Sequence, residues 1–364
     1  MGQPLLNIEE LQVKRGGSLV LDIPVFSVET GEFLSLIGPN GTGKSTLLLT
    51  LACLIKPHHG CLSFHGRKIM DSKAVTDYRR QVSVVFQESL LFDTTVFENV
   101  ASGLKIRGLS HKAREPIVEK CLDRFGITHL GSRSARKLSG GEAQRTSLAR
   151  AFATDPEIIF LDEPFSSLDP PTREGLIVDL IRILKETKTT ALMATHDQSE
   201  ALRLSDRLAV MNGGKIIQIG PCAEVVNHPV NEFVASFIGV ETLLNGTVTT
   251  CRNGVVTVDV SGRTIEAIGD IPPGASVTCC IRPEHVMLVK HLNQGVSSAR
   301  NNIPAKIRSI QTMGLFYKIH LDCGFPIIAY LTRSSLEELC LDRENDVIAS
   351  FKATAVHLIR TQTT

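Results

Sequence analysis

A glycine-rich segment, GPNGTGKST, is the first stretch whose residue types and spacing could do chemistry. Glycines let the backbone curl so that several N–H groups face one anion, and a helix that starts directly after them adds its positive N-terminal end. The ammonium of Lys44 can reach β- and γ-phosphate oxygens, and the hydroxyl of Ser45 can bind Mg²⁺. The sequence therefore predicts a nucleotide-phosphate site made of Gly38, Pro39, Asn40, Gly41, Thr42, Gly43, Lys44, Ser45 and Thr46.

Two adjacent carboxylates close a buried-strand pattern, IIFLDEP, far downstream of this loop. Asp162 stands at the polar end of the strand, where it can hold Mg²⁺ through water. Glu163 follows directly and can orient and deprotonate an attacking water. An acidic pair at a strand end is common by itself, but together with the glycine-rich loop it favours phosphate hydrolysis.

A second loop suited to anions, LSGGEAQR, runs from Leu138 to Arg145. Ser139, Gly140 and Gly141 can offer a hydroxyl and backbone N–H groups at a helix N-terminus. Taken alone, the same residues are also typical of a helix-capping turn. The sequence thus raises the question of why one chain has two loops suited to the same phosphates.

Strands that alternate with helices position these loops. Buried-strand patterns cover 33–38, 158–164 and 190–196, and helical patterns begin near Lys44 and cover 111–125 and 172–188. Such alternation predicts an α/β domain with a largely parallel sheet. The stripe of Val118, Leu122 and Phe125 is interpreted as core packing.

The pattern changes to period-2 strands and turns after about residue 239. This change predicts an all-β C-terminal domain of small OB-like barrels, in two similar halves around the polar segment 293–302. The segment 228–239 is predicted to be a linker helix. We therefore expect domains at 1–239 and 240–364.

Composition excludes several classes of protein. The chain has 364 residues with 39 Lys and Arg against 38 Asp and Glu, which gives no electrostatic case for a nucleic-acid partner. Nine cysteines without a CxxC pair indicate free thiols in a reducing compartment. We find no signal-peptide pattern and no apolar run long enough to span a bilayer, so a membrane role would have to come through a partner.

The motifs together resemble those of ATP-binding cassette (ABC) ATPases, and the chain looks like the ATP-binding subunit of an importer. They occur in the order GPNGTGKST, VFQ ending in Gln87, LSGGEAQR, IIFLDEP, SSLD ending in Asp169, and ATHD with His196. The resemblance implies a P-loop domain that uses ATP and Mg²⁺. It also implies a head-to-tail homodimer in which the LSGGEAQR loop, through Ser139, Gly140, Gly141 and Glu142, caps ATP held by the partner's P-loop.

The resemblance assigns roles to further residues. Gln87 would touch Mg²⁺ or the lytic water, and His196 would contact the γ-phosphate and steady Glu163. Asp169 would act across the dimer interface, and the segment 88–100 would meet a transmembrane partner. Many family members stack adenine on an early aromatic residue, whereas this chain has Arg15 there, either as a stacking guanidinium or as an ordinary exposed side chain.

The C-terminal segments 279–289, 297–307 and 351–359 resemble TOBE/MOP barrel modules, the last two with molybdate-binding signatures. A tetrahedral dianion needs N–H groups, hydroxyls and a balancing cation in a compact pocket. Candidate oxyanion ligands are Ser298, Ala299, Arg300, Asn301, Lys352, Ala353 and Thr354. The same segments could instead only pack two barrels together, and Pro304 and Ala305 depart from the signature.

Three hypotheses follow. The first is an importer ATPase for molybdate or tungstate, or for sulfate, a sugar, a polyamine or iron. It would be a homodimer, peripheral on the cytoplasmic side of the inner membrane, joined to permease subunits and indirectly to an extracytoplasmic solute-binding protein. The second is a soluble ABC ATPase acting on DNA or ribosomes. The third is an oxyanion sensor with an idle ATP site, against which the intact Lys44, Asp162, Glu163 and His196 argue.

Overall fold

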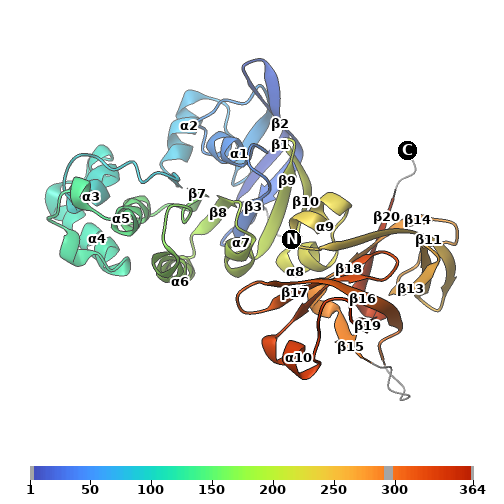
Figure 1. Ribbon diagram of the computed structural model, residues 1–364. Coiled ribbons are helices and arrows are strands. Elements are labelled where there is room, and N and C mark those ends of the chain that lie inside the picture. Colours follow the sequence, from blue (N-terminus) through green and yellow to red (C-terminus); the bar gives the residue numbers. More distant parts are fainter. Residues whose placement is uncertain (1–3, 291–297, 362–364) are drawn as a thin grey trace. The chain divides into compact units, whose positions relative to one another are not determined.

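The computed structural model describes residues 4–290 and 298–361, and it divides the chain into two compact units, Met1–Cys222 and Ala223–Thr364. The first unit is built on a six-stranded sheet in the order β10-β9-β3-β8-β7-β6 (Figure 1). Its strands are Lys215–Pro221 (β10), Arg207–Asn212 (β9), Phe33–Ile37 (β3), Thr190–Thr195 (β8), Ile158–Asp162 (β7) and Val82–Val85 (β6). All neighbouring strands are parallel except β10 and β9.

The central strands are almost uniformly apolar because helices or a second sheet cover both faces. All five residues of β3 and all six of β8 are buried. The helices of this unit are Lys44–Leu51 (α1), Ser72–Arg79 (α2), Val96–Ile106 (α3), His111–Arg124 (α4), Gly140–Phe152 (α5), Pro170–Thr187 (α6) and Gln198–Leu204 (α7). The predicted α/β sheet and its flanking helices are confirmed.

A four-stranded antiparallel sheet, which the sequence analysis did not predict, packs on α1 and the central sheet. It has the order β2-β1-β4-β5, with strands Ser18–Val28 (β2), Leu6–Arg15 (β1), His59–Phe64 (β4) and Arg67–Lys68 (β5). Leu21, Leu47 and Phe160 belong to one buried cluster that joins this sheet, α1 and the central sheet. The cluster fixes the helix that follows the glycine-rich loop.

Helices α3, α4 and α5 gather on their own side of this unit (Figure 1). The predicted stripe of Val118, Leu122 and Phe125 is buried in the cluster that they share with the central sheet. The N-terminus of α5 carries the LSGG residues, so this packing decides where the second loop lies.

The second unit is all-β apart from short helices, which agrees with the predicted fold class. It contains two five-stranded antiparallel sheets, β13-β12-β11-β14-β20 and β15-β19-β16-β17-β18. The strands of the first sheet are Arg263–Ile268 (β13), Val255–Val260 (β12), Thr242–Arg252 (β11), Ser276–Ile281 (β14) and Val356–Arg360 (β20). Those of the second are Met287–Val289 (β15), Asp346–Phe351 (β19), Asn301–Thr312 (β16), Tyr317–Asp322 (β17) and Pro326–Leu331 (β18). Short helices are Cys222–Asn227 (α8), Glu232–Phe237 (α9) and Arg333–Glu338 (α10).

The two sheets exchange their last strands. After β14 the chain forms a 3-10 turn at Pro283–His285 and continues as β15, which pairs with β19 of the other sheet. The second half repeats this path, because β19 leads through Ala353–Ala355 into β20, which pairs with β14. One buried cluster therefore includes side chains of both halves, so neither sheet has a separate core.

The compact units separate before the predicted linker helix, whereas the sequence analysis places the boundary after residue 239. Hydrogen bonds tie residues 223–239 to the β-rich unit. Thr278 Oγ1 donates to Glu232 Oε1 at 2.5 Å, and Arg282 Nη2 donates to the Val226 carbonyl at 2.7 Å. The helix itself is shorter than predicted, because Asn231 caps it and it ends at Phe237.

Candidate functional site

The glycine-rich loop joins β3 to α1 and is tightly enclosed by its own unit. Gly43 caps α1 with a φ of 99°, and a Cβ there would lie 2.6 Å from Leu21 Cδ2. A Cβ on Gly38 would lie 2.3 Å from the Met211 carbonyl oxygen. Only glycine fits this close approach, so the curl of the loop is fixed by packing before any ligand binds.

Lys44 lies at the centre of the loop. It is only 5% exposed, and its Nζ donates to the carbonyls of Gly38 at 2.7 Å and Pro39 at 3.0 Å. Burial lowers the pKa of Lys44, and the nearby carboxylates of Glu163 and Asp162 oppose that shift. The ammonium is thus held by carbonyl oxygens that a phosphate can replace with a full negative charge.

Ser45 and Asp162 bring together the loop and the end of β7. Ser45 Oγ donates to Asp162 Oδ1 at 2.8 Å. Burial raises the pKa of Asp162, and the hydrogen bond from Ser45 works against this. A hydroxyl and a carboxylate are the hard oxygen donors that Mg²⁺ prefers, so the pair fits that ion.

The pair would hold Mg²⁺ only together with other ligands. In residues 4–290 and 298–361, no group of three His, Cys, Asp or Glu side chains is arranged to bind a metal. Mg²⁺ that is bound to a nucleotide takes most of its ligands from phosphate oxygens and waters.

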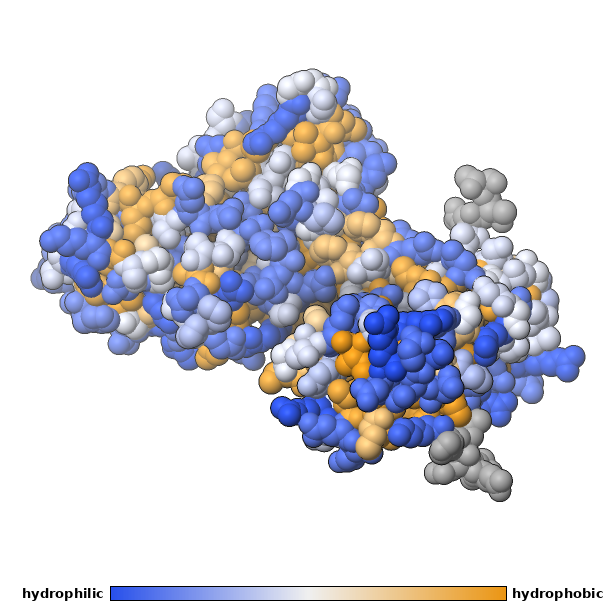
Figure 2. Space-filling view, viewed as in Figure 1, coloured by the Kyte–Doolittle hydropathy of each residue, from blue (hydrophilic) through white to orange (hydrophobic). Residues whose placement is uncertain are grey.

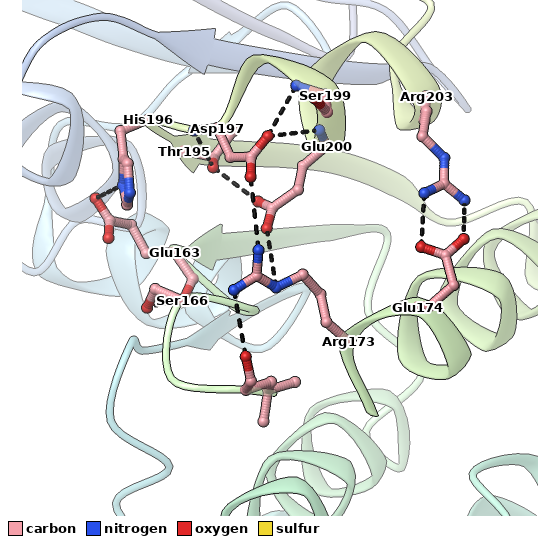
Figure 3. A network of polar contacts seen from close by, with 11 residues as sticks. Glu163, Ser166, Arg173, Glu174, Thr195, His196, Asp197, Ser199, Glu200 and Arg203 are labelled. Carbon is pink, nitrogen blue, oxygen red and sulfur yellow. Dashed lines mark hydrogen bonds and ion pairs between the residues drawn. The ribbon is translucent and has the colours of Figure 1, made fainter. Parts of the chain in front are cut away.

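Glu163 directly follows β7 and faces His196, which directly follows β8. Their closest approach is 3.2 Å, between Glu163 Oε1 and His196 Nδ1 (Figure 3). The Glu163 side chain is 17% exposed and that of His196 is 53% exposed, so the carboxylate has limited access to water. Glu163 has a φ of 45°, which is uncommon for a residue other than glycine, and its backbone N–H donates to the Ala194 carbonyl.

Gln87 lies two residues beyond the end of β6 and is exposed. Because β6, β7 and β8 are parallel, Gln87, Glu163 and His196 all follow the carboxyl ends of neighbouring strands. The structure therefore brings the predicted catalytic and metal-binding residues to one edge of the sheet, beside the glycine-rich loop.

The LSGG residues form the start of α5. Ser139 caps the helix in a reciprocal box, in which Glu142 N–H donates to Ser139 Oγ at 3.3 Å and Ser139 N–H donates to Glu142 Oε2 at 2.7 Å. The Ser139 backbone hydrogen bond lowers the pKa of Glu142. The first helical N–H groups, of Gly140 and Gly141, point out of the helix end without a partner in the helix. The loop is thus a well-formed capping turn whose outer face is still able to bind an anion.

Asp169 shares a hollow with these residues. It caps α6 by accepting a hydrogen bond from the Thr172 N–H at 3.2 Å, and hydrogen bonding to Thr172 lowers its pKa. The hollow has a volume of about 520 Å³. It is lined by Ser139, Gly140, Gly141, Glu142, Arg145, Ser167, Leu168, Asp169 and Thr172.

The predicted ATP-binding residues therefore fall into two groups. None of the residues that line the LSGG hollow belongs to the loop 38–46 or to Asp162, Glu163 and His196. The sequence analysis did not single out Arg145 and Thr172 of this hollow, although Arg145 is the last residue of the LSGGEAQR motif. Arg15, the candidate adenine contact, is exposed at the end of β1.

Five of the seven candidate oxyanion ligands line a hollow of about 660 Å³ in the second unit. They are Ser298, Arg300, Lys352, Ala353 and Thr354. Arg252 and Glu266, which the sequence analysis did not name, line it as well, and Glu266 accepts two hydrogen bonds from Arg300.

The remaining two candidates are buried beside this hollow. Asn301 donates its amide to the Glu266 carbonyl at 2.9 Å and accepts from the Glu266 N–H at 2.7 Å. The amide of Asn301 thus holds β13, and Ala299 is 5% exposed. The arrangement leaves the hydroxyls of Ser298 and Thr354 and the cations of Arg252, Arg300 and Lys352 facing the hollow.

Other features bear on the site only indirectly. All nine cysteines lie in the described ranges and are free thiols. Among the helices of the described residues, none combines the length and the apolar character needed to cross a bilayer.

Comparisons with known proteins agree with this geometry. Residues 21–166 match the family model described as "ABC transporter", and residues 297–358 match the "TOBE domain". The molybdate/tungstate import ATP-binding protein WtpC of Pyrococcus horikoshii is 37% identical, over 92% of this chain and 94% of its own length. The sulfate/thiosulfate import ATP-binding protein CysA of Mycolicibacterium paratuberculosis is 35% identical, over 95% and 89%.

Relatives with another solute in their name are equally similar. The spermidine/putrescine import ATP-binding protein PotA of Ruegeria pomeroyi is 38% identical, over 72% of this chain and 71% of its own length. Among solved structures, cbiO1 of Clostridium perfringens has a TM-score of 0.58 and 28% identity, covering 66% of this chain and 96% of that one. The ATP-binding cassette MJ0796, a dimer in a post-hydrolysis state bound to ADP and Pi, has a TM-score of 0.55 and 29% identity, covering 60% and 98%.

Proposed function

Because the chain belongs to the ABC transporter family and combines its ATP-binding domain with a TOBE domain, we propose that this ATPase powers the import of molybdate or tungstate. That the chain is an ABC importer ATPase follows from the family and from full-length relatives. One observation supports the catalytic assignment. The Ser45–Asp162 and Glu163–His196 pairs lie beside the loop 38–46 at one edge of the sheet.

In the proposed reaction, the loop N–H groups and Lys44 bind the β- and γ-phosphates. Bound Mg²⁺, held by Ser45 and Asp162 with Gln87 nearby, would neutralise phosphate charge. Glu163 accepts a proton from water as the water oxygen attacks the γ-phosphorus and the bond to the β-phosphate oxygen breaks, giving ADP and phosphate. His196 holds the carboxylate of Glu163 in place through the contact at 3.2 Å and can reach the γ-phosphate.

The second anion loop has its role in a homodimer. A nucleotide on the loop Gly38–Thr46 would expose its γ-phosphate to water unless another surface covers it. The LSGG hollow, with free helical N–H groups and exposed Ser139 and Gly140, fits that purpose on a second copy of the chain. Each dimer would then contain two sites, each made from both copies.

Membrane attachment is proposed to occur through permease subunits, with the chain peripheral on the cytoplasmic side of the membrane. Leu90 and Phe92, in the segment after β6, and Ile106, at the end of α3, are 58%, 56% and 83% exposed. Apolar patches are also visible on the surface of this first unit in Figure 2. Such side chains suit an interface with an apolar partner. An extracytoplasmic solute-binding protein would deliver the solute to the permease.

The choice of an oxyanion is supported by the hollow of the second unit. Arg252, Arg300 and Lys352 face it, against the single carboxylate of Glu266. This excess of cations favours a tetrahedral dianion and disfavours a polyamine. We propose that a bound oxyanion there slows the ATPase as feedback, whereas selection of the transported solute lies with the other subunits.

Uptake by the reconstituted transporter tests the proposal. With its permease in vesicles, the chain should support ATP-dependent uptake of radiolabelled tungstate that excess spermidine does not compete with. Uptake of spermidine or sulfate in preference to tungstate would overturn the choice of solute but not the ATPase. Co-purification with nucleic acid instead of a permease would favour the soluble alternative.

The feedback proposal has its own test. Calorimetry should detect molybdate binding to the full chain, and Lys352→Ala combined with Arg252→Ala should abolish it. Calorimetry without detectable binding, together with an ATPase rate unchanged by excess molybdate, would refute the regulatory site and leave a purely structural module.

A further inference from the structure

Arg173, in the first turn of α6, has contacts in two functional segments, although none of the sequence motifs includes it. Its Nη2 donates to the Leu168 carbonyl at 3.2 Å. Its Nη1 lies 3.6 Å from Asp197 Oδ2, and its Nε lies 3.9 Å from Glu200 Oε1 (Figure 3). One guanidinium thus spans the segment before α6 and the start of α7.

The two carboxylates that face Arg173 shape the turn that carries His196. Glu200 Oε2 accepts a hydrogen bond from Thr195 Oγ1 at 2.8 Å, and the same hydroxyl accepts from the Asp197 N–H at 3.0 Å. Asp197 Oδ1 also accepts from the N–H groups of Ser199 and Glu200, which caps α7. The backbone on both sides of His196 is therefore held by this network.

Glu200 is an unusual anchor for such a turn, because its side chain is only 7% exposed. Burial raises the pKa of Glu200, and the hydrogen bond from Thr195 and the charge of Arg173 oppose the shift. A buried carboxylate without a cation is costly, so loss of Arg173 would leave the turn around His196 less firmly held.

The other end of the network lies in the LSGG hollow. Leu168, whose carbonyl accepts from Arg173, lines that hollow together with Ser167 and Asp169. Asp169 starts α6 as its cap, one turn before Arg173. The segment 167–169 is thus joined to the guanidinium by a hydrogen bond.

We propose that Arg173 is a positioning residue that couples the LSGG side of the chain to its own hydrolytic site, by fixing the turn of His196 relative to the segment 167–169. The inference rests on the proposed roles of His196 and Asp169. When the partner's nucleotide fills the hollow beside Asp169, Arg173 holds His196 against Glu163 in the same chain. The guanidinium donates one hydrogen bond, to the Leu168 carbonyl, and lies within ion-pair distance of Asp197 and Glu200, although its buried Nε has no hydrogen-bond partner among the described residues. A lysine ammonium on a single stem does not reproduce this planar arrangement.

The chain offers a matched control in Arg203. Its two terminal nitrogens contact both oxygens of Glu174 at 2.7 and 2.5 Å, and so link the same two helices, α7 and α6. This exposed pair contacts neither the turn of His196 nor the Leu168 carbonyl in the described interactions (Figure 3). Arg203→Ala removes an arginine tie between α6 and α7 without touching the proposed coupling.

Steady-state ATPase assays on the full chain test the proposal, with Tm measured for each variant. Arg173→Ala should lower kcat about tenfold or more, because a small misplacement of catalytic groups has a large effect on rate. The KM for ATP should stay within about twofold and the Hill coefficient for ATP should fall towards one. Arg173→Lys should recover little of the rate, and Arg203→Ala should behave like the unmodified chain. Equal behaviour of Arg173→Ala and Arg203→Ala would overturn the proposal.

A double variant distinguishes coupling through His196 from general damage. If Arg173 acts through His196, Arg173→Ala should add little to the loss of kcat caused by His196→Ala. Multiplicative losses would overturn the proposal. If His196→Ala alone leaves kcat unchanged, the proposed role of His196 fails. If His196→Ala lowers kcat but Arg173→Ala and Arg173→Lys do not, only the positioning role fails.

Discussion

Lys44 and Ser139 both stand at the start of a helix and both belong to a loop suited to phosphate, yet their surroundings differ. Lys44 is buried, its ammonium is held by two carbonyls, and Ser45 and Asp162 are already hydrogen-bonded beside it. Ser139 is exposed, and its contacts are those of its own helix cap. The first loop is therefore organised by its own unit, whereas the second presents donors to a group that its unit does not supply.

Under the proposed homodimer, this difference would account for the presence of two anion-binding loops in one chain. A loop enclosed by strands can fix Lys44, Mg²⁺ ligands and a base on one side of a nucleotide. It leaves the opposite side open to water. In the proposed homodimer, a loop that keeps its donors exposed would complement the first loop on a second copy.

Replacing the proposed general base, Glu163, should cause the largest loss of ATPase activity. Glu163→Gln keeps the size of the side chain and the neighbourhood of His196 but cannot accept a proton. We expect kcat to fall about 10³-fold with ATP affinity retained, as measured by steady-state turnover and by nucleotide-binding titration. Turnover near that of the unmodified chain would refute Glu163 as the base.

A negative charge introduced at the second loop should have a smaller but still large effect on activity. Ser139→Asp keeps a good helix cap while it places a carboxylate where the partner's phosphate would lie. We expect ATPase activity to fall about 10²-fold with an unchanged Tm. Ser110→Asp, at the cap of α4, serves as the control and should keep full activity.

A mixture of variants tests whether the second loop acts on another copy. Lys44→Ala and Ser139→Asp chains should each be nearly inactive, but a mixed dimer contains one intact site. Mixing should therefore restore turnover well above that of either variant. A mixture that stays as slow as its components would contradict the shared site.

Adding one methyl group to each loop, at Gly43 or Gly140, should affect stability in the first loop and activity in the second. Gly43→Ala meets Leu21 at 2.6 Å in a backbone conformation of φ 99°, so it should lower the free energy of unfolding by about 1–3 kcal/mol. Gly140→Ala meets nothing within 4 Å and should leave the Tm of the isolated chain unchanged. Its ATPase activity should nonetheless fall, because the added methyl group would face the partner's nucleotide. Thermal melts and turnover assays of both variants check this, and a large loss of stability in Gly140→Ala would contradict it.

Neutralising a single carboxylate should change the Tm only slightly, with opposite signs for Asp162 and Glu142. The Tm is measured in EDTA and without nucleotide. Burial holds the pKa of Asp162 above its usual 3.8, so its ionised form weakens the fold above that raised pKa. Asp162→Asn should therefore raise the Tm at pH 7, and the gain should disappear below pH 3.8, where both states are protonated.

Glu142 should behave in the opposite way. Its pKa is held below the usual 4.5, so its ionised form stabilises the fold above pH 4.5, and this is lost as pH falls through the lower folded pKa. Glu142→Gln should lower the free energy of unfolding by about 0.5 kcal/mol at pH 7. Stability changes of the same sign in Asp162→Asn and Glu142→Gln at pH 7 would contradict this expected difference.

The sequence predicted well which residues lie at the carboxyl edge of the sheet, because each of them is local to a strand end. The segments FLSLI, IIFLD and TALMAT are mostly apolar, which identifies them as buried parallel strands, and the residues at the end of each one must then lie at the carboxyl edge. Asp162, Glu163 and His196 could thus be placed without coordinates. The four-stranded sheet of the first unit was missed, although its two long strands form a hairpin around Gly16 and Gly17, a signal that is local in the sequence. Only the pairing of β1 with β4 crosses a gap in sequence that no local pattern reports.

The C-terminal residues were less predictable for the same reason. Ser298 and Thr354 were correctly grouped, and they line one hollow, but Asn301 turned out to hold β13 through Glu266. Arg252, which adds a cation to that hollow, is the last residue of β11 and lies more than forty residues earlier in the chain than Ser298. The exchange of β15 and β20 between the two halves brings these segments together.

By itself, the sequence determined the chemistry of the ATP site, because glycine spacing, Lys44, Ser45 and the adjacent Asp162 and Glu163 are set by short-range constraints of backbone and charge. Only the tertiary structure decided which side chains lie between the segments that carry Asp169 and His196. Arg173 meets Leu168, Asp197 and Glu200 because α6 packs beside α7, and the LSGG hollow exists because the starts of α5 and α6 lie together. Such contacts depend on the packing of elements distant in sequence, which no local pattern encodes.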